Sequence, residues 1–516
     1  MTLNIKQGSR LFLSAALIVP ALARADDKAV EPALVVRAVG PDRQAEAVLK
    51  LFEGSKAPSP AAAMANWRRA TGNPDGLPKA VQAVAAMFNP EMVAEWRAFR
   101  DVVLAVRFEP NGAMQWSAVA PHDDGTLAAM VTSMRLSGGG DEPPLAGTPV
   151  ERMGEEGSAL AAVTPRGTAF ASRRAELAGA LDRLSKQEPE PSFDLLALTP
   201  EDSGFRFVLD PSRLVADPAR SVIPSQVVAG LKAAGLKTSA GFLSLRGDRL
   251  GLDLASRFAA ERPAMLDTPA IDPTWLSWFP VDSTLAAVAL ATGRGAAFWD
   301  SLFEIADRID RADPDRAQLQ PLRVRINLMA TLRGVRPEVD LWPLLRGVSA
   351  GVVLLGDPNM PVGVGVVVAL HAERPEDAER IHRRVIQPAL AGRERFADQP
   401  IKSIVRGGMV LVGWGEGAIA TALKSAEAPE QSAATLIGRD DHPISRAGVF
   451  RPSVVDVTRF DGADLALTVM LAQSEFIVWK GGWAREKAWD VVRWGDLKRS
   501  VARFLEIVPQ APPEAP

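Results

Sequence analysis

The stretch RFEPNGAMQWSAVAPH (residues 107–122) returns in altered form as LGDPNMPVGVGVVVALH (residues 355–371), and this pair decides the fold. Each copy holds a Pro-Asn pair between two runs that contain few charges, and both residue types are typical of turns. Valine dominates the second copy, which favours strands. We therefore predict a β-hairpin in each copy. We interpret residues 349–370 as two buried strands rather than a membrane-spanning helix.

The correspondence continues in the same order on both sides of the hairpin. Three further pairs of segments match, namely 32–54 with 283–305, 89–111 with 336–359, and 166–184 with 406–426. A helix with one buried face follows each hairpin, carrying Leu127, Met130, Val131 and Met134 in the first copy and Ala378, Ile381 and Val385 in the second. Four matches in one order indicate a tandem duplication.

Each copy is expected to close with a further hairpin. In the first copy, residues 239–258 alternate around a turn at Arg246-Gly247-Asp248. Residues 464–482 are the predicted counterpart in the second copy. A helix from near Trp483 should follow, and it would carry Trp489, Val492, Leu497 and Phe504.

The predicted fold class is α+β, a tandem duplication of a strand-helix/hairpin-helix unit in which antiparallel or mixed sheets are covered by helices. The predicted divisions are a signal peptide (1–25), a first half (26–262), a linker (263–273), a second half (274–508) and a disordered tail (509–516). Duplicated halves are expected to form a cleft at their junction, where a ligand or partner would bind.

The N-terminus has the pattern of a secretory signal peptide. Lys6 and Arg10 precede the apolar run 11–23, and small residues follow it. The run is shorter than the about 20 residues that a transmembrane helix needs. We predict cleavage after Ala25, with cleavage after Ala23 as the alternative. The mature chain should then be exported to the periplasm, the cell surface or the medium, with no transmembrane segment.

Composition narrows the classes of function. The chain has no cysteine, which excludes disulfides, thiolate nucleophiles, iron–sulfur ligands and a lipid-anchored cysteine. A formal net charge of −3 gives no basic footprint for nucleic acid. Hydrophobic residues make up 47% of the chain and charged residues 23%, as in an ordinary soluble globular protein.

The motif GVSAG (347–351) matches the nucleophile elbow of serine hydrolases. Ser349 would be the nucleophile, with Asp440 or Asp441 and His442 completing a triad in hydrolase order. The elbow needs a strand before the serine and a helix after it. Here a predicted helix precedes Gly347 and a predicted strand follows, so a helix end is the preferred interpretation. An envelope serine hydrolase stays as the alternative function.

The motif GWGEGA (413–418) matches a dinucleotide-binding turn between strand and helix. The corresponding segment of the first copy, ASRRAELA, lacks the glycines. A strand-to-helix turn that uses glycine flexibility is the preferred interpretation. We therefore predict no cofactor.

Histidines and tryptophans give weaker signals. The histidines are His122, His371, His382 and His442, and none forms a metal-ligand motif such as H-E-x-x-H. A ligand role is open for the HDD segment at 122–124, but capping of the following helix is preferred for His122 and His371. No metal site is predicted. Trp489 and Trp494 either contact a glycan or close the core.

A segment that opens a strand-helix unit, FPVDSTLAAVAL (279–290), resembles a group of exported bacterial proteins that carry a domain of unknown function. The signal peptide and the repeated hairpins add to this resemblance, which covers residues 270–425 best. It implies export and this type of fold, and it implies no activity.

The preferred prediction of function is a non-enzymatic exported binding or scaffold protein of the cell envelope, without catalytic residues. An envelope protein, a glycan or a small apolar ligand is its expected partner, and a carrier of an apolar ligand is the third class of function considered.

Overall fold

The structure is a computed structural model. It describes residues 32–71, 101–109, 113–122, 141–153, 159–186, 196, 202–214, 225–259, 268–293, 295–313, 320–357, 360–392, 394–438, 440–452, 476–484 and 487–507. The predicted cleavage residues Ala23 and Ala25, the tail 509–516 and the predicted helix at 127–134 lie outside these ranges.

Strands and helices alternate irregularly up to residue 258. The strands are β1 (Leu34–Val39), β2 (Asp101–Phe108), β3 (Met114–Pro121), β4 (Asp141–Leu145), β5 (Thr148–Met153), β6 (Ala159–Thr164), β7 (Gly167–Ala171), β8 (Gly204–Leu209), β9 (Leu236–Arg246) and β10 (Arg249–Phe258). The helices are α2 (Pro41–Phe52), α3 (Pro60–Thr71), α7 (Arg174–Lys186) and α8 (Ser225–Ala233), with a 3₁₀ turn η3 (Pro211–Arg213).

The rest of the chain continues in the same style. Its strands are β11 (Thr284–Ala291), β12 (Leu345–Asp357), β13 (Met360–Ala372), β14 (Arg395–Phe396), β15 (Gln399–Arg406), β16 (Met409–Trp414), β17 (Ile444–Phe450), β18 (Ile477–Ala484) and β19 (Lys487–Trp494). Its helices are α9 (Ala297–Arg311), α10 (Leu322–Thr331), α11 (Pro337–Asp340), α12 (Pro375–Ile381), α13 (Gln387–Leu390), α14 (Ala418–Glu427), α15 (Ala434–Ile437) and α17 (Leu497–Ile507). Short turns are η5 (Pro273–Leu276), the π-helical η6 (His382–Ile386) and η7 (Pro429–Gln431).

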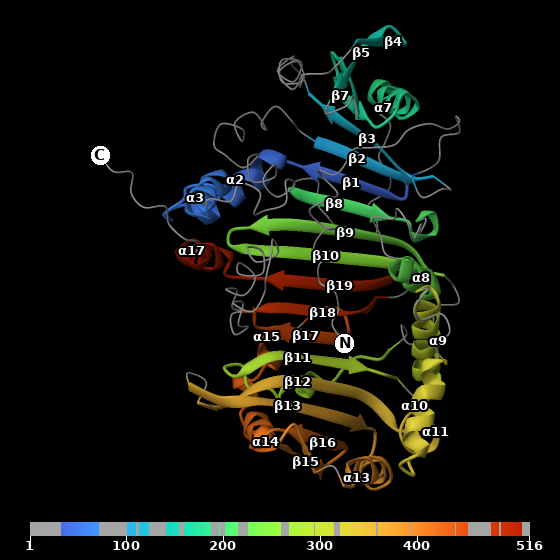
Figure 1. Ribbon diagram of the computed structural model, residues 1–516, viewed down its shortest axis with the longest axis vertical. Coiled ribbons are helices and arrows are strands. Elements are labelled where there is room, and N and C mark those ends of the chain that lie inside the picture. Colours follow the sequence, from blue (N-terminus) through green and yellow to red (C-terminus); the bar gives the residue numbers. More distant parts are fainter. Residues whose placement is uncertain are drawn as a thin grey trace.

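The strands of the described ranges form one antiparallel arrangement of 19 strands (Figure 1). The pairings give the order β4-β5-β6-β7-β3-β2-β1-β8-β9-β10-β19-β18-β17-β11-β12-β13-β16-β15-β14. The β2–β3 and β12–β13 hairpins, which carry the two matching sequence stretches, take the second and third places inward of β6 and β15, respectively. β10 and β19 pair in the middle over eight residue pairs, from Leu250↔Trp494 to Arg257↔Lys487.

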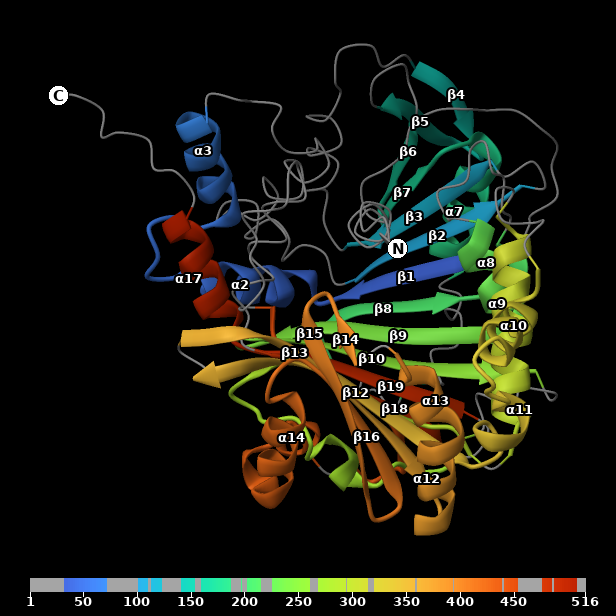
Figure 2. The ribbon, with the colours of Figure 1, turned by 60° about the horizontal axis from the view of Figure 1, so that its bottom comes forward.

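The predicted fold class is wrong. Sequence reasoning expected a duplication whose halves each keep a sheet under a layer of helices, but a single antiparallel sheet crosses both predicted halves. The physical reason is the β10–β19 pair, which uses the edges that two separate sheets would have left open. Helices cover only parts of this sheet (Figures 1 and 2). The domain boundaries themselves stay a prediction.

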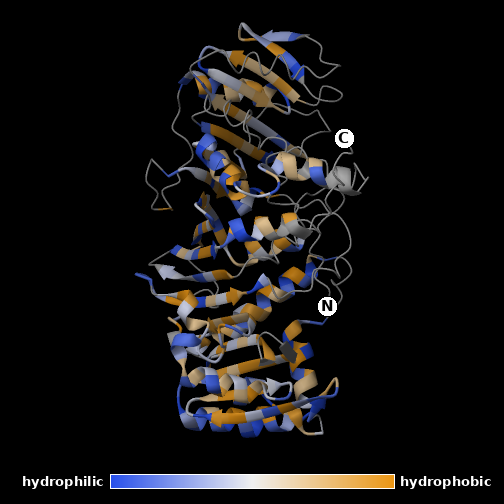
Figure 3. Ribbon diagram, turned by 90° about the vertical axis from the view of Figure 1, so that its left-hand side faces the viewer, coloured by the Kyte–Doolittle hydropathy of each residue, from blue (hydrophilic) through white to orange (hydrophobic). Residues whose placement is uncertain are grey.

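Apolar residues line the strands over the whole length of the sheet (Figure 3). On one face, α7 packs over β3, β6 and β7 through Leu177 and Ala180, while α14, α15 and η5 pack over β11–β13 and β16. The opposite face carries α12, η6 and α9 at one end of the strands, around Ile381 and Val385. Helices α2 and α17 pack at the other end of the strands near the sheet centre, on Leu245. Both faces are therefore partly covered.

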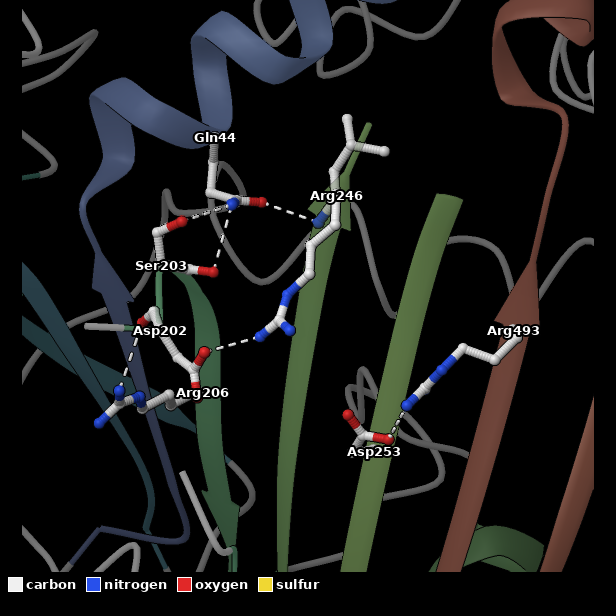
Figure 4. A network of polar contacts seen from close by, with 8 residues as sticks. Gln44, Asp202, Ser203, Arg206, Arg246, Asp253 and Arg493 are labelled. Atoms are coloured by element: carbon white, nitrogen blue, oxygen red, sulfur yellow. Dashed lines mark hydrogen bonds and ion pairs between the residues drawn. The ribbon is translucent and has the colours of Figure 1, made fainter. Parts of the chain in front are cut away.

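Polar contacts fix α2 to the sheet (Figure 4). The Gln44 side chain donates to the Ser203 carbonyl (3.2 Å) and hydroxyl (3.0 Å), and its oxygen accepts from the Leu245 N–H (2.9 Å). The amide thus satisfies strand-end groups that have no ladder partner there. An ion pair between Arg493 and Asp253 (2.6 Å) spans β19 and β10.

Other local predictions had mixed outcomes. The turn between β9 and β10 lies at the predicted place, with Gly247 at φ +64°. The predicted counterpart hairpin at 464–482 is wrong, because residues 477–494 form the β18–β19 hairpin, and the predicted helix begins only at Leu497. Within the predicted linker, Ile271 is buried in the core, and its N–H donates to the Ile444 carbonyl (2.7 Å).

Candidate functional site

Ser349, the predicted hydrolase nucleophile, lies inside strand β12 and is fully buried. Its Oγ is 2.9 Å from Nε2 of His371 on the neighbouring strand β13. The His371 ring stacks on Trp275, with centroids 4.2 Å apart and planes 8° from parallel. The Trp275 ring also lies against Gly347, where a Cβ atom would come within 2.0 Å of it. Serine and histidine are thus enclosed beneath an indole ring.

Burial controls the charge of this pair. Desolvation lowers the pKa of His371 from 6.5 to about 4, and the carboxylate of Asp272 partly opposes that change. Asp272 itself accepts from the Thr274 N–H (2.9 Å) and hydroxyl (2.8 Å), and so caps η5. The imidazole is therefore neutral at pH 7 and has a hydroxyl partner, as buried polar groups require. The predicted helix-capping role of His371 is wrong, since the ring points into the core.

The structure does not bring Ser349 together with the other predicted triad residues. Asp440 pairs with Lys480 (3.0 Å), and its Oδ1 accepts from the His442 N–H (3.3 Å). His442 is exposed two residues before β17, and its ring lies 6.0 Å from that of Trp489. Strand β11 separates β17 from β12. A nucleophile elbow is also absent here, because Ser349 continues a regular strand.

The GWGEGA segment forms the predicted strand-to-helix turn. β16 ends at Trp414, and α14 begins at Ala418. Gly415 and Gly417 have φ values of +104° and +84°, which favour glycine. These dihedrals account for the glycines without a bound phosphate.

The remaining histidines also bond to hydroxyl groups. His122 Nε2 lies 3.0 Å from Thr168 Oγ1 in the interior, and His382 Nε2 lies 3.0 Å from Ser403 Oγ. Among the residues that the structure places, no group of three or more His, Cys, Asp or Glu side chains is arranged to hold a metal ion.

The C-terminal tryptophans lie on strands rather than on the predicted helix. Trp489 and Trp494 are both in β19, while Trp479 and Trp483 are in β18. Trp479 Nε1 donates to Asp490 Oδ1 (3.1 Å), and Arg446 binds the same carboxylate through Nε (2.8 Å) and Nη2 (2.6 Å). Sequence reasoning missed this arrangement because aromatic and charged residues alternate without a clear period.

A continuous line of apolar residues crosses one face of the sheet, and we call it the apolar row. Opposed residues of antiparallel strands point to the same face, so the registers define its members. Twelve adjacent strands contribute Val102, Ala38, Phe205, Leu243, Leu252, Val492, Trp479, Gly448, Val288, Ala350, Val368 and Val412. The row crosses the β10–β19 junction, where a cleft between halves was predicted.

The apolar row is only partly covered. All its members except Gly448 keep solvent exposure, and Val288 is 48% exposed. Neighbouring residues on the same strands point their side chains to the opposite face. Ala287 and Val367, for example, are buried there under α14 and η5, with exposed fractions of 1% and 0%. A solvated sheet face ordinarily carries polar residues. A partly exposed apolar face therefore marks a candidate binding surface.

Helices border the apolar row along both ends of the strands (Figure 1). α2 and α17 pack on Leu250 and Trp494, two residues along the strands from the row. At the other end, α8 packs near Leu104, and α9 and α12 pack near Leu370. The Arg446–Asp490 ion pair lies on the same face, two residues along the strands from the row. Trp479, a member of the row, donates a hydrogen bond to the Asp490 carboxylate.

A signal for the apolar row was present in the sequence. In residues 366–370 every side chain is valine, alanine or leucine, whereas a strand with one solvated face would alternate apolar and polar residues. We predicted two buried strands there. The hairpin is confirmed, but only one of its faces is buried.

The fold and this surface define the class: a mainly antiparallel-sheet protein with partial helical cover and an open apolar face. No family model and no curated protein matches the chain. Solved structures of TP0453 in crystal forms IV, III and I are similar at TM-scores of 0.25, 0.26 and 0.26 and at 12%, 10% and 8% identity. They cover 44–45% of this chain and 76–78% of TP0453, and likeness at this level supports no conclusion about function. Within the described ranges, every helix is too short or too polar to cross a membrane.

Proposed function

We propose that this protein is exported and works as a non-enzymatic binding protein of the cell envelope, holding an apolar ligand on the apolar row. The observation that carries the proposal is the partly exposed apolar row, to which twelve strands contribute. Apolar surface that stays partly exposed is costly in water, and a ligand that covers it gains that free energy. The proposed function is therefore that of a carrier of an apolar ligand.

The dimensions of the row favour a long ligand. Neighbouring strands lie about 4.8 Å apart, so twelve of them extend over about 50 Å. An acyl chain or a comparable linear apolar molecule laid across the strands would contact side chains from many of them. A glycan fits this surface less well, because its hydroxyl groups would find few partners beside the Arg446–Asp490 pair.

The decisive experiment measures apolar probe binding by the full chain. N-phenyl-1-naphthylamine fluorescence should rise on addition of protein and fall when a long-chain fatty acid competes. Val288→Glu places a charge at the most exposed member of the row and should weaken probe binding at least about tenfold. Val227→Glu is the matched control, because Val227 is 43% exposed on α8, outside the row, and it should bind like the wild type.

Equal probe binding by the two glutamate variants would overturn the proposal, as would a wild-type protein that gives no probe signal. Far-UV circular dichroism of each variant establishes that the sheet is intact. A readout from Trp479 adds a positional test: its replacement by Phe should remove a ligand-induced change in tryptophan emission.

Export is tested separately by intact and native mass spectrometry of protein from the exported fraction of its own host. The expected mass is that of a chain cleaved after Ala25 or, in the alternative, after Ala23. A discrete additional mass that denaturation releases would be the ligand. Protein found only in the cytosol with residues 1–25 retained would contradict export.

A further inference from the structure

Helix α10 presents large apolar side chains to solvent. Val324, Leu328 and Leu332 are four residues apart and lie on one side of the helix and its C-cap. Their exposed fractions are 48%, 55% and 76%, and adjacent Met329 is 56% exposed. None of the ten residues of α10 is buried. Such a group of exposed apolar side chains marks an interaction surface.

Ion pairs hold α10 against the protein. Arg323 binds Glu338 of α11 through two nitrogens (2.8 and 2.5 Å). Arg325 pairs with Asp310 of α9 (2.7 Å). Ion pairs to α9 and α11 (Figures 1 and 2) therefore fasten the helix, while its four exposed large apolar side chains keep between 48% and 76% exposure.

Positive charge borders the exposed apolar residues. Arg333 follows the helix C-cap and is exposed, and it makes no ion pair with any residue that the structure places. The Arg336 side chain is 71% exposed, and its Nε lies at the long distance of 3.7 Å from Oδ2 of Asp340. The Asp340 carboxylate is already bound by Arg380 at 2.8 Å. Apolar side chains beside surplus arginine are the composition that binds anionic membrane surfaces.

We propose that residues 322–336 dock on the surface of an anionic lipid bilayer. Leu328, Met329 and Leu332 would enter the boundary between headgroups and acyl chains, and Arg333 and Arg336 would bind headgroup phosphates. A second copy of this chain is the poorer occupant. A two-fold contact through this patch would pair the patch with itself, and the Asp340 carboxylate beside it is already bound by Arg380. The proposal does not depend on ligand binding by the apolar row.

The test is sedimentation of the full chain with phosphatidylglycerol-containing vesicles and with pure phosphatidylcholine vesicles. Binding should require the anionic lipid and weaken as salt rises. Leu328→Ser/Leu332→Ser should lower the partition coefficient about tenfold or more, since the apolar contacts are lost. Arg333→Gln/Arg336→Gln should lower it about fivefold for each arginine. A matched control, Val227→Ser/Phe396→Ser, removes apolar residues that are 43% and 68% exposed elsewhere, and it should bind normally.

Three results would overturn the proposal. Wild-type protein that stays in the supernatant with anionic vesicles is the first. The second is equal loss of binding in the control and in the leucine variant. The third is a wild-type dimer in analytical ultracentrifugation that Leu328→Ser/Leu332→Ser converts to a monomer, which would identify the patch as a contact between copies. Circular dichroism establishes that each variant is folded before its binding is compared.

Discussion

Acidification should destabilise the β12–β13 region through His371. The ring is 3% exposed, stacked on Trp275 and bonded to Ser349. Burial lowers its pKa to about 4, whereas an unfolded chain binds this proton near 6.5. Below 6.5 the unfolded state therefore holds more protons than the folded state, and stability falls with pH until about 4 is reached. Above 6.5 this group contributes no pH dependence.

The magnitude follows from the same two values. At about 1.4 kcal/mol per pH unit, the pKa difference between 6.5 and about 4 lowers the free energy of unfolding by about 3 kcal/mol once the pH is below both values. Between pH 7.5 and pH 4.5 the loss should be about 2.5 kcal/mol. Urea unfolding at these two pH values, followed by tryptophan fluorescence, measures the total change. Carboxylates also titrate in this interval, so a variant must isolate the histidine.

Ser349→Ala/His371→Phe removes the titrating group together with its hydroxyl partner and keeps a ring over Trp275. Replacing both partners of a buried hydrogen bond by apolar groups is nearly neutral for stability. The double variant should lose about 2.5 kcal/mol less than the wild type over the same pH interval. His442→Gln, which removes an exposed histidine, controls for the change in histidine number. A double variant as acid-sensitive as the wild type would refute the reasoning.

Two further variants test packing and charge in the sheet. Gly347→Ala should cost about 1–3 kcal/mol of stability, because its Cβ would meet the Trp275 ring at 2.0 Å. Gly363→Ala on β13 has open space around its Cβ and should cost far less. Urea unfolding midpoints compare the two variants, and equal midpoints would contradict the packing argument. Arg446→Met should cost about 2 kcal/mol, because it leaves a carboxylate that is only 22% exposed without its bidentate partner. Arg493→Met breaks a more exposed pair and should cost at most about 0.5 kcal/mol in the same assay, so a reversed ranking would count against burial as the cause.

Local patterns predicted elements better than they predicted assembly. The strand-helix units at 32–54 and 283–305 appear as β1 with α2 and β11 with α9. These units could be predicted because strands and helices bury residues with different periods, and the spacing of apolar residues in a short stretch of sequence shows which period is present. Pairing between strands that are far apart in the sequence leaves no comparable pattern. The joining of β10 to β19 therefore lay beyond sequence reasoning.

Site prediction failed for a related reason. Ser349 was singled out by a five-residue motif, but its partner is decided by the β12–β13 register, which places His371 beside it. The apolar row is likewise a property of register, because its members come from strands scattered between residues 38 and 492. Only the unbroken apolar residues in 366–370 hinted at it.

The β10–β19 pair also constrains how the chain is completed during synthesis. Residues 249–258 are made long before residues 487–494, which must return to them across more than two hundred positions. Contacts so distant in sequence slow folding, because the chain entropy is lost before the pairing is gained. Until the last hairpin arrives, β10 is an unprotected strand edge that invites pairing with other chains. A nascent or prematurely ended chain that lacks β19 should therefore aggregate, because residues 487–494 are needed to complete the centre of the sheet.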